Sequence, residues 1–278
     1  QTPETLIITP TPTNKQHTSI KQNSMNLLNF QKTIDKPKDQ IQQAMVERPE
    51  CDISKTQVMV KLFQVPVENR DDAWEKSFYE NVQTASYACG SPQVINGPDG
   101  FPYFVLLTPE ANKPFESFCI RNMKDDFLLE DGLGVVLNPR ENGVDWVFSY
   151  GDILNLHLNK EFFSKTDNIE LQNVETIEKE EEILIAQPSE SYFPKQSRAI
   201  LRSFLQSIGV EEPKIMMVCR KMEGEVIQEL AFNLFAEDFE NIDHLNFRLK
   251  QISWFLPRHY VILSVPKNAE WIAHFDDL

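Results

Sequence analysis

Residues 125–150, DDFLLEDGLGVVLNPRENGVDWVFSY, decide the fold because they contain the end of one helix and the bounds of two strands. Gly132 stands where a helix would end, since glycine adopts the left-handed conformation of a helix C-terminus without strain. LGVVLNP then predicts a strand that stops at Pro139, and RENG predicts a tight turn into a second strand, VDWVFSY. Asp152 follows as the expected cap of another helix. The stretch therefore predicts a scaffold of short strands and helices.

Gly132 and Gly134, two residues apart, could in principle belong to a phosphate-binding loop. Gly132 and Gly134 would need a third glycine at position 137 for a dinucleotide-binding fingerprint, and Leu137 stands there. The pair also precedes its strand, whereas the fingerprint follows one. The chain has nine glycines, the first of them Gly90, and contains neither GxxxxGK[ST] nor GxSxG. We therefore interpret the glycines as turn residues.

The residues just before this stretch predict one strand and one helix. NGPDG, residues 96–100, contains two turn dipeptides, and the aromatic and aliphatic run 101–107 predicts a buried strand. NKPFESFCIRNMKDDFLLE, residues 112–130, predicts a helix with Pro114 in its first turn.

The N-terminal part predicts a tail followed by further elements. Residues 1–24 are rich in Thr, Pro, Gln and Asn, and we expect a flexible tail because the prolines of TPTPT block helix. A helical pattern begins at Asn26. TQVMVKLFQVPVEN, residues 56–69, predicts a β-strand by its valines, and DDAWEKSFYENV, residues 71–82, predicts a helix or a turn that begins with an acidic cap. We assign residues 25–165 to an N-terminal α+β domain.

The second half has a regular alternation of strand and helix patterns. Residues 166–182 form an expected acidic linker, because the glutamates of NVETIEKEEE are too dense for a core. Residues 183–278 predict a C-terminal α+β domain of order β-α-β-β-α-β. Its last helix, DFENIDHLNFRLKQISWFL, presents one apolar face: Phe239, Ile242, Leu245, Leu249 and Ile252. The expected fold is thus two small α+β domains that fold separately, with mixed or antiparallel sheets and helices packed on one face.

Composition limits the partners of the chain. Its 278 residues carry a net charge of -15, with a pI near 4.8. Such a surface repels nucleic-acid phosphates and anionic lipid, so we expect no nucleic-acid partner. No apolar run approaches the roughly 20 residues of a membrane span. An unknown protein partner of basic or polar character is the expectation that remains, and the oligomeric state stays open.

The cysteines indicate a reducing compartment. Cys51, Cys89, Cys119 and Cys219 form no CxxC motif and no repeated framework, and three of them lie in or beside apolar runs. A buried free thiol behaves as a small hydrophobic group. The sequence therefore predicts four free thiols and a cytoplasmic location.

The spacing of the histidines and acidic residues matches no catalytic or metal-binding pattern. No histidine pairs with another at helical spacing or lies near a cysteine in the sequence; the five are His17, His157, His244, His259 and His274. The adjacent acidic pairs fit helix caps, turns or a tail better than a converging site; they are Asp71-Asp72, Asp125-Asp126 and Asp276-Asp277. We therefore predict no catalytic, cofactor-binding or metal-binding residue and no cofactor.

Five further side chains carry a structural expectation. Cys219 is expected in the core of a strand, and Arg220 beside it points away because adjacent strand residues alternate faces. Trp146 and Trp254 lie in apolar runs and are expected core residues. Trp271, near the C-terminus, fits equally a side chain that packs back on the domain and one presented to a partner.

The order of these patterns resembles the SseB-like proteins, named for enhanced serine sensitivity B. DGFPYFVLLTPEA is similar to the family's strand before a helix, DDFLLEDGLGVVLNP to its helix followed by a strand, and DWVFSYGDILNL to its closing strand and helix. PSESYFPKQSRAILRSFLQSIGV and the strands after it are similar to the C-terminal domain of the family. The resemblance covers about residues 40–268 and rests on apolar and turn residues. It implies a two-part α+β protein, has no counterpart for the Thr/Pro-rich start, and carries over no catalytic residue.

Three functions are compatible with the sequence. The first is a non-enzymatic protein-interaction or regulatory protein. The second is a toxin-neutralising immunity protein, whose acidic face would cover a basic groove. The third is an enzyme with a site at the domain interface, which a pocket of converging carboxylates or a contact between His259 and Cys219 would favour.

Overall fold

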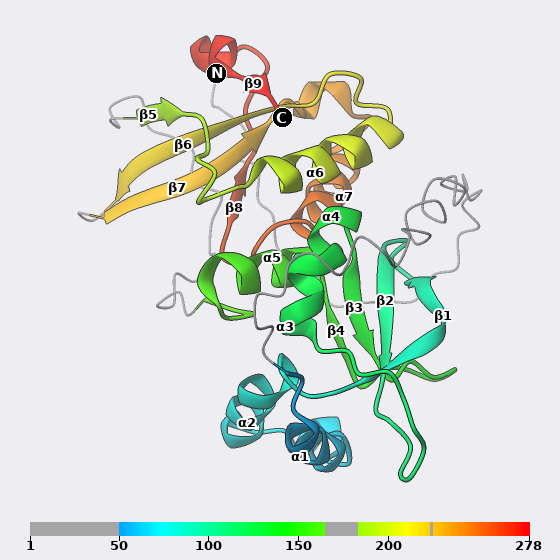
Figure 1. Cartoon of the computed structure of the whole chain (residues 1–278). Coiled ribbons are helices and arrows are strands. Elements are labelled where there is room, and N and C mark those ends of the chain that lie inside the picture. The colour runs from blue at the N-terminus through cyan, green and yellow to red at the C-terminus, as the bar shows by residue number, and fades with distance from the viewer. Residues whose placement is uncertain (1–49, 165–182, 223–224) are drawn as a thin grey trace, which may run out of the picture.

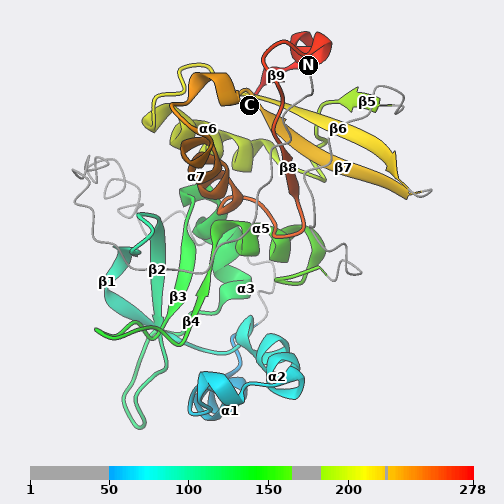
Figure 2. The ribbon, with the colours of Figure 1, turned by 180° about the vertical axis from the view of Figure 1, so that it is seen from behind.

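A computed structural model describes residues 50–164 and 183–278, apart from residues 223–224. The protein has an α+β fold with two mixed sheets. Figures 1 and 2 show one sheet in the upper part of the molecule and the other lower down, with α4 (Leu129–Asp131), α5 (Tyr150–Asn159), α6 (Lys195–Ser207) and α7 (Ile242–Ser253) lying between them. The expected tail, the helical pattern from Asn26 and the acidic linker lie outside the described residues.

The first half builds a four-stranded sheet of order β1-β2-β3-β4, in which only β2 and β3 are parallel. The elements of this half are α1 (Ile53–Phe63), α2 (Asp72–Val82), β1 (Ala88–Asn96), β2 (Pro102–Leu107), α3 (Ile120–Met123), a π-helical turn (Lys124–Leu128), α4 (Leu129–Asp131), β3 (Gly134–Leu137), β4 (Trp146–Phe148) and α5 (Tyr150–Asn159). The helical segment between β2 and β3 makes the crossover that parallel strands require.

The second half builds a second sheet of order β5-β6-β7-β8, with β9 paired to the start of β6. The elements are β5 (Ile183–Ala186), α6 (Lys195–Ser207), β6 (Lys214–Met222), β7 (Glu225–Phe232), α7 (Ile242–Ser253), β8 (Val261–Leu263), a 3-10 turn (Glu270–His274) and β9 (Asp276–Asp277). The order β5-α6-β6-β7-α7-β8 is the one that the sequence predicts. Again only β7 and β8 are parallel, and α7 connects them.

The prediction of a strand at residues 56–69 is wrong, because this segment contains most of helix α1 and a 3-10 turn. The buried residues Thr56 and Met59 are three apart, which is helical spacing, and the Asp52 carboxylate accepts from the Ser54 amide to cap the helix. The valines that suggested a strand are exposed or half-buried. Burial on one helical face outweighs their β propensity.

The helix predicted at residues 112–130 is shorter than expected. It begins at Ile120, and the chain before it is extended, with Phe118 paired to Tyr87 in an antiparallel bridge. Asn112 adopts a positive φ of 62°, which a helix does not allow. The last predicted helix likewise begins at Ile242, after Phe239.

The stretch 125–150 folds largely as the sequence predicts. Gly132 ends a helix with φ of 70°, and β3 and β4 follow. The cap of α5 is Ser149, one turn earlier than expected: its hydroxyl accepts from the Asp152 amide, and the Asp152 carboxylate accepts from the Ser149 amide. This reciprocal pair is a capping box.

One buried apolar cluster contains residues of both halves. Trp254, just after α7, stacks on Phe101 with ring centroids 4.3 Å apart, and its indole nitrogen donates to the Tyr103 hydroxyl at 2.7 Å. Gly151 is required at the junction, because a Cβ there would stand 1.9 Å from the carbonyl oxygen of Leu256. Trp254 is buried in this cluster, as expected, whereas Trp146 is half-buried and packs against the cluster beside Trp74.

The C-terminal segment packs back on the second sheet. Trp271 and Phe275 cover a smaller cluster formed by Met216, Val218 and neighbouring residues. The Leu278 amide donates to the Pro213 carbonyl at 3.0 Å. Of the two alternatives for Trp271, the structure shows the first.

The prediction of four free thiols is wrong. A disulfide joins Cys51, just before α1, to Cys119, just before α3, whereas Cys89 and Cys219 are free. The two partners are 68 residues apart in the sequence, and folding brings their Cα atoms to 5.6 Å. The bond ties the segment before α1 to the segment before α3, and an isolated parallel bridge between Asp52 and Ala85 joins the two ends of the α1–α2 hairpin. Within the described residues, no helix is long and apolar enough to cross a membrane.

Candidate functional site

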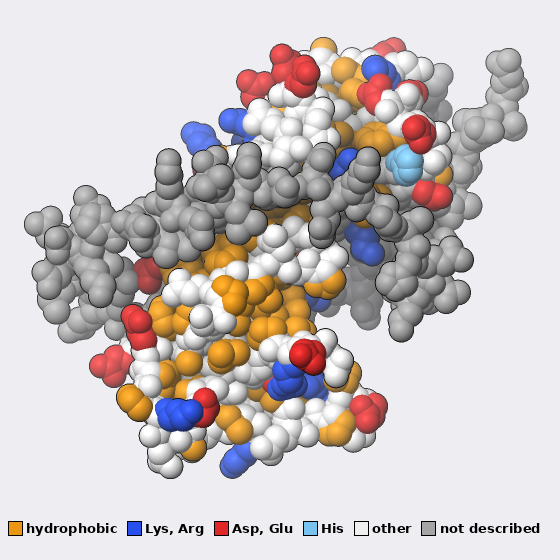
Figure 3. Space-filling model, turned by 90° about the vertical axis from the view of Figure 1, so that its right-hand side faces the viewer, with side chains coloured by type: hydrophobic (Ala, Val, Ile, Leu, Met, Phe, Trp, Pro, Cys, Tyr) orange, Lys and Arg blue, Asp and Glu red, His pale blue; other side chains and the backbone are white. Residues whose placement is uncertain are grey.

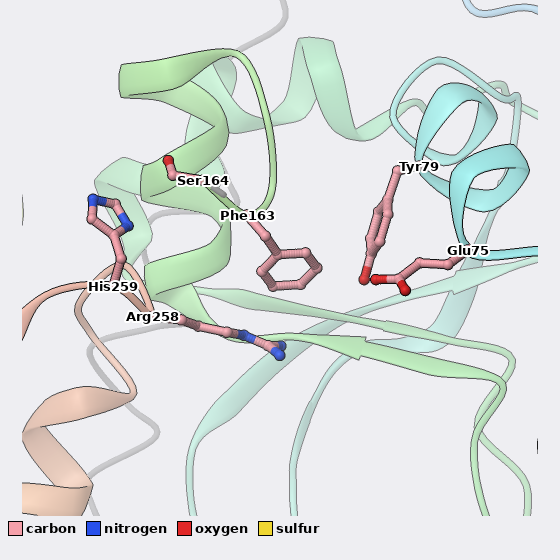
Figure 4. Close-up of a pocket in the computed structure, with 6 residues that line it drawn as sticks. All are labelled: Glu75, Tyr79, Phe163, Ser164, Arg258 and His259. Carbon is pink, nitrogen blue, oxygen red and sulfur yellow. The ribbon is translucent and has the colours of Figure 1, made fainter. Parts of the chain in front are cut away.

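The candidate site is a hollow of about 260 Å³ between the two halves of the molecule. Six residues from three segments line it: Glu75 and Tyr79 from α2, Phe163 and Ser164 from the chain after α5, and Arg258 and His259 from the loop between α7 and β8. Figure 4 shows the Arg258 guanidinium pointing past the Phe163 ring towards Glu75 and the hydroxyl end of Tyr79. The site therefore exists only when the halves are together.

Arg258 is held rigidly across this junction. Its Nε and Nη2 donate to the two carboxylate oxygens of Asp152, at 2.8 and 2.9 Å. The Asp152 side chain is fully buried, whereas that of Arg258 is 60% exposed. The guanidinium also lies 4.1 Å from the centre of the Phe163 ring. Bidentate pairing and the cation–π contact together fix the direction of the guanidinium.

Aromatic rings form the opposite wall. Tyr79 meets Phe163 edge to face, with centroids 5.0 Å apart. Burial raises the pKa of the Tyr79 hydroxyl, and the nearby charge of Glu75 raises it further. The phenol therefore keeps its proton at physiological pH and can donate a hydrogen bond into the hollow.

The remaining lining groups are a neutral imidazole and a hydroxyl. Burial lowers the pKa of His259 below its ordinary value of 6.5, so the uncharged form predominates at pH 7. The Ser164 hydroxyl is within hydrogen-bonding distance of the side chains of Asn155 and Asn159, at 3.3 to 3.4 Å. No hydrogen bond joins Ser164 to His259 among the residues that the structure describes.

The charges around the hollow sum to minus one. Arg258 supplies one positive charge, Asp152 and Glu75 supply two negative charges, and His259 is neutral. Since Asp152 uses both oxygens on Arg258, the excess negative charge is that of Glu75, which is exposed at the mouth. The arrangement can bind a polar or positively charged group and hold it against aromatic rings.

The other residues considered from the sequence lie elsewhere. Cys219 is buried in the main core, burial raises the pKa of its thiol, and no contact with His259 is found within the described part of the chain. Arg220 points to the other face of the sheet, as expected, where it forms a bidentate pair with Glu229 at 2.7 and 2.9 Å. The contact between His259 and Cys219 that would have favoured an enzyme is therefore not found.

The other histidines and the acidic pairs lie outside the hollow where the structure describes them. His157 contacts Asp125 at 2.9 Å, His244 lies 3.7 Å from Glu240 and His274 is exposed; His17 lies outside the described residues. Asp71 caps α2, and Asp276-Asp277 form β9. No group of metal-ligating side chains is found within residues 50–164 and 183–278.

The cluster around Asp125 was not foreseen. Asp125 lies on the π-helical turn. The buried Lys124 and the partly exposed His157 of α5 both contact its carboxylate. Although burial opposes ionisation, the hydrogen bonds from Lys124 and His157 lower the pKa of Asp125 overall. The cluster ties two helical segments together and lies outside the hollow.

Comparisons of the chain with models of protein families, with curated proteins and with solved structures found no match.

Proposed function

We propose that this is a non-enzymatic protein-interaction module, SseB-like in organisation, which recognises a basic protein partner. The observation that carries the proposal is the construction of the hollow. Asp152 and Phe163 fix a guanidinium, while the exposed Glu75 and the half-buried Tyr79 ring line the same hollow. Rigid charged and aromatic groups that are exposed together are typical of recognition surfaces.

Two further features support this proposal. The chain carries a net charge of -15, which favours encounter with a basic partner. Seen from the side of β1, hydrophobic side chains gather in the lower half of the molecule, at the level of the first sheet (Figure 3). Contiguous apolar surface marks interaction sites in soluble proteins.

An enzyme with a site at the domain interface is the second candidate. The hollow does lie between the halves, and it contains His259 in a form able to accept a proton. Against catalysis stands the Asp152 carboxylate, which is fully engaged with Arg258 and the cap of α5.

The compartment is part of the proposal. Four free thiols would favour the cytoplasm, but Cys51 and Cys119 form a disulfide. Disulfides persist in oxidising compartments, so we propose that the protein works in one.

Affinity capture from the native cell tests the function. The tagged protein should retain one basic protein in stoichiometric amount, and the complex should form again from the two purified components. Binding should weaken as salt is raised, because charge pairs at a surface are screened. Absence of a stoichiometric partner, together with conversion of a compound from a metabolite mixture, would favour the enzyme instead.

A further inference from the structure

We propose that the hollow between the halves receives an arginine side chain of the basic partner, with its guanidinium against the Glu75 carboxylate and the Tyr79 ring. This rests on the proposed function and specifies which group of the partner is recognised.

The molecule itself contains the pattern for such a site. Arg258 is held by one buried carboxylate, Asp152, and one aromatic face, Phe163. Immediately beside it, Glu75 and Tyr79 present a second carboxylate and a second ring, and Figure 4 shows the carboxylate next to the hydroxyl end of that ring. Within the described residues no cation is paired with Glu75. The second pair therefore repeats the chemistry of the first.

Charge favours a cation over an anion in this position. The charge of Arg258 is matched by Asp152, so a ligand in the hollow meets the unmatched charge of Glu75. His259 stays neutral at pH 7 and does not repel a cation. An anion would be repelled by Glu75, and it could contact only the outer edge of the Arg258 guanidinium, which is already paired with Asp152.

Geometry favours a guanidinium over an ammonium. A planar guanidinium stacks on an aromatic ring and offers two parallel N–H bonds to one carboxylate. The Tyr79 hydroxyl and the imidazole of His259 lie within the same hollow and can accept further N–H bonds. A volume of about 260 Å³ is large enough for the end of one side chain and too small for a folded segment.

The test is calorimetric titration of the full chain with three capped tripeptides: Ac-Ala-Arg-Ala-NH2, Ac-Ala-Gln-Ala-NH2 and Ac-Ala-Glu-Ala-NH2. The arginine peptide should bind with a dissociation constant on the order of 1 mM, and the other two should bind more weakly. Glu75→Gln removes the charge at the mouth and should weaken binding of the arginine peptide about fivefold.

Glu80→Gln is the matched control, because Glu80 lies on the same helix, is exposed and does not line the hollow. It should leave binding unchanged. To locate the peptide, the ring signals of His259 should shift in NMR spectra, and His259→Gln assigns them. Equal binding of all three peptides, tighter binding of the glutamate peptide, or equal effects of the two variants would overturn the inference.

The two proposals fail in different ways. A stoichiometric partner whose binding is insensitive to Glu75→Gln would preserve the interaction function and overturn the arginine site. Selective binding of the arginine peptide by a protein that captures no partner would preserve the site and overturn the interaction function.

Discussion

At the scale of residues, Asp152 links the two halves of the molecule. It completes the cap of α5, holds Arg258 from the second half and is fully buried. A buried carboxylate is stable only when its lone pairs are matched by donors. The position of Arg258, and with it one wall of the hollow, therefore depends on the first turn of α5.

Arg258→Met should destabilise the protein by removing two of the donors to Asp152. The loss should be on the order of 2 kcal/mol, between the small value of an exposed pair and the larger value of a buried one, because Arg258 is partly solvated. Urea denaturation measures it. Lys195→Met is the control, since Lys195 and Glu190 are both exposed and 3.9 Å apart, and it should cost less than about 0.5 kcal/mol. Equal effects would mean that Asp152 does not depend on Arg258.

His259 gives a prediction about pH. Its pKa is lower in the folded protein than its ordinary value of 6.5, so the unfolded chain binds more protons as the pH falls below that value. Stability should therefore decrease from pH 7 towards acid, and His259→Gln should reduce the slope between pH 7 and 5. Thermal melts of both proteins across this range measure the effect; identical slopes would contradict it.

At the scale of elements, the disulfide ties the start of α1 to the start of α3. Closing a loop of 68 residues restricts the unfolded chain, and the chain-entropy estimate gives a stabilisation of about 4 kcal/mol. Thiol labelling of denatured protein should therefore find two free thiols without reductant and four with it.

Cys51→Ser and Cys119→Ser should each lower the melting temperature, whereas Cys89→Ser should lower it little. Four free thiols in protein freshly isolated from its own compartment would contradict the disulfide and restore the cytoplasmic prediction.

Helix α7 holds the second sheet to the core through one face. Leu249 is buried and Lys250 beside it is exposed. Leu249→Ala should cost about 2–5 kcal/mol by leaving a cavity, and Lys250→Ala less than about 0.5 kcal/mol. Denaturant titrations compare the two. Similar costs would show that the apolar face of α7 is misassigned.

The sequence is informative about elements where the signal is local. The sequence correctly predicts the helix end at Gly132, the turn RENG and the buried positions Leu245, Leu249 and Ile252 of α7, because turn chemistry and periodicity act over a few residues. The segment 56–69 was misread, because its valines suit a strand and only packing against α2 selects a helix. The partners Cys51 and Cys119, like Asp152 and Arg258, are 68 and 106 residues apart, and no local pattern links them.

At the scale of the whole molecule, the two halves share one buried apolar cluster, so the stability of each half depends on the other. The positions of the domain boundaries stay a prediction, since residues 165–182 lie outside the described chain. However, Trp254 packs on Phe101 and Tyr103 of the first half. A fragment of residues 183–278 would expose this surface, so we expect it to be less stable alone than within the chain.

The hollow also requires contact between the two halves, because its lining residues come from both. If the halves opened independently, Arg258 and Glu75 would separate and the arginine site would be lost. The central claim is therefore that the two sheets and the helices between them unfold as one unit.

Hydrogen exchange in increasing urea, followed by mass spectrometry, tests this claim most directly. Peptides covering β3 in the first sheet and β6 in the second report the two halves separately in the intact chain. A shared core predicts that both peptides lose protection with the same midpoint and the same dependence on urea. Loss of protection in β6 at a lower urea concentration, while β3 stays protected, would show two independent domains and contradict the account.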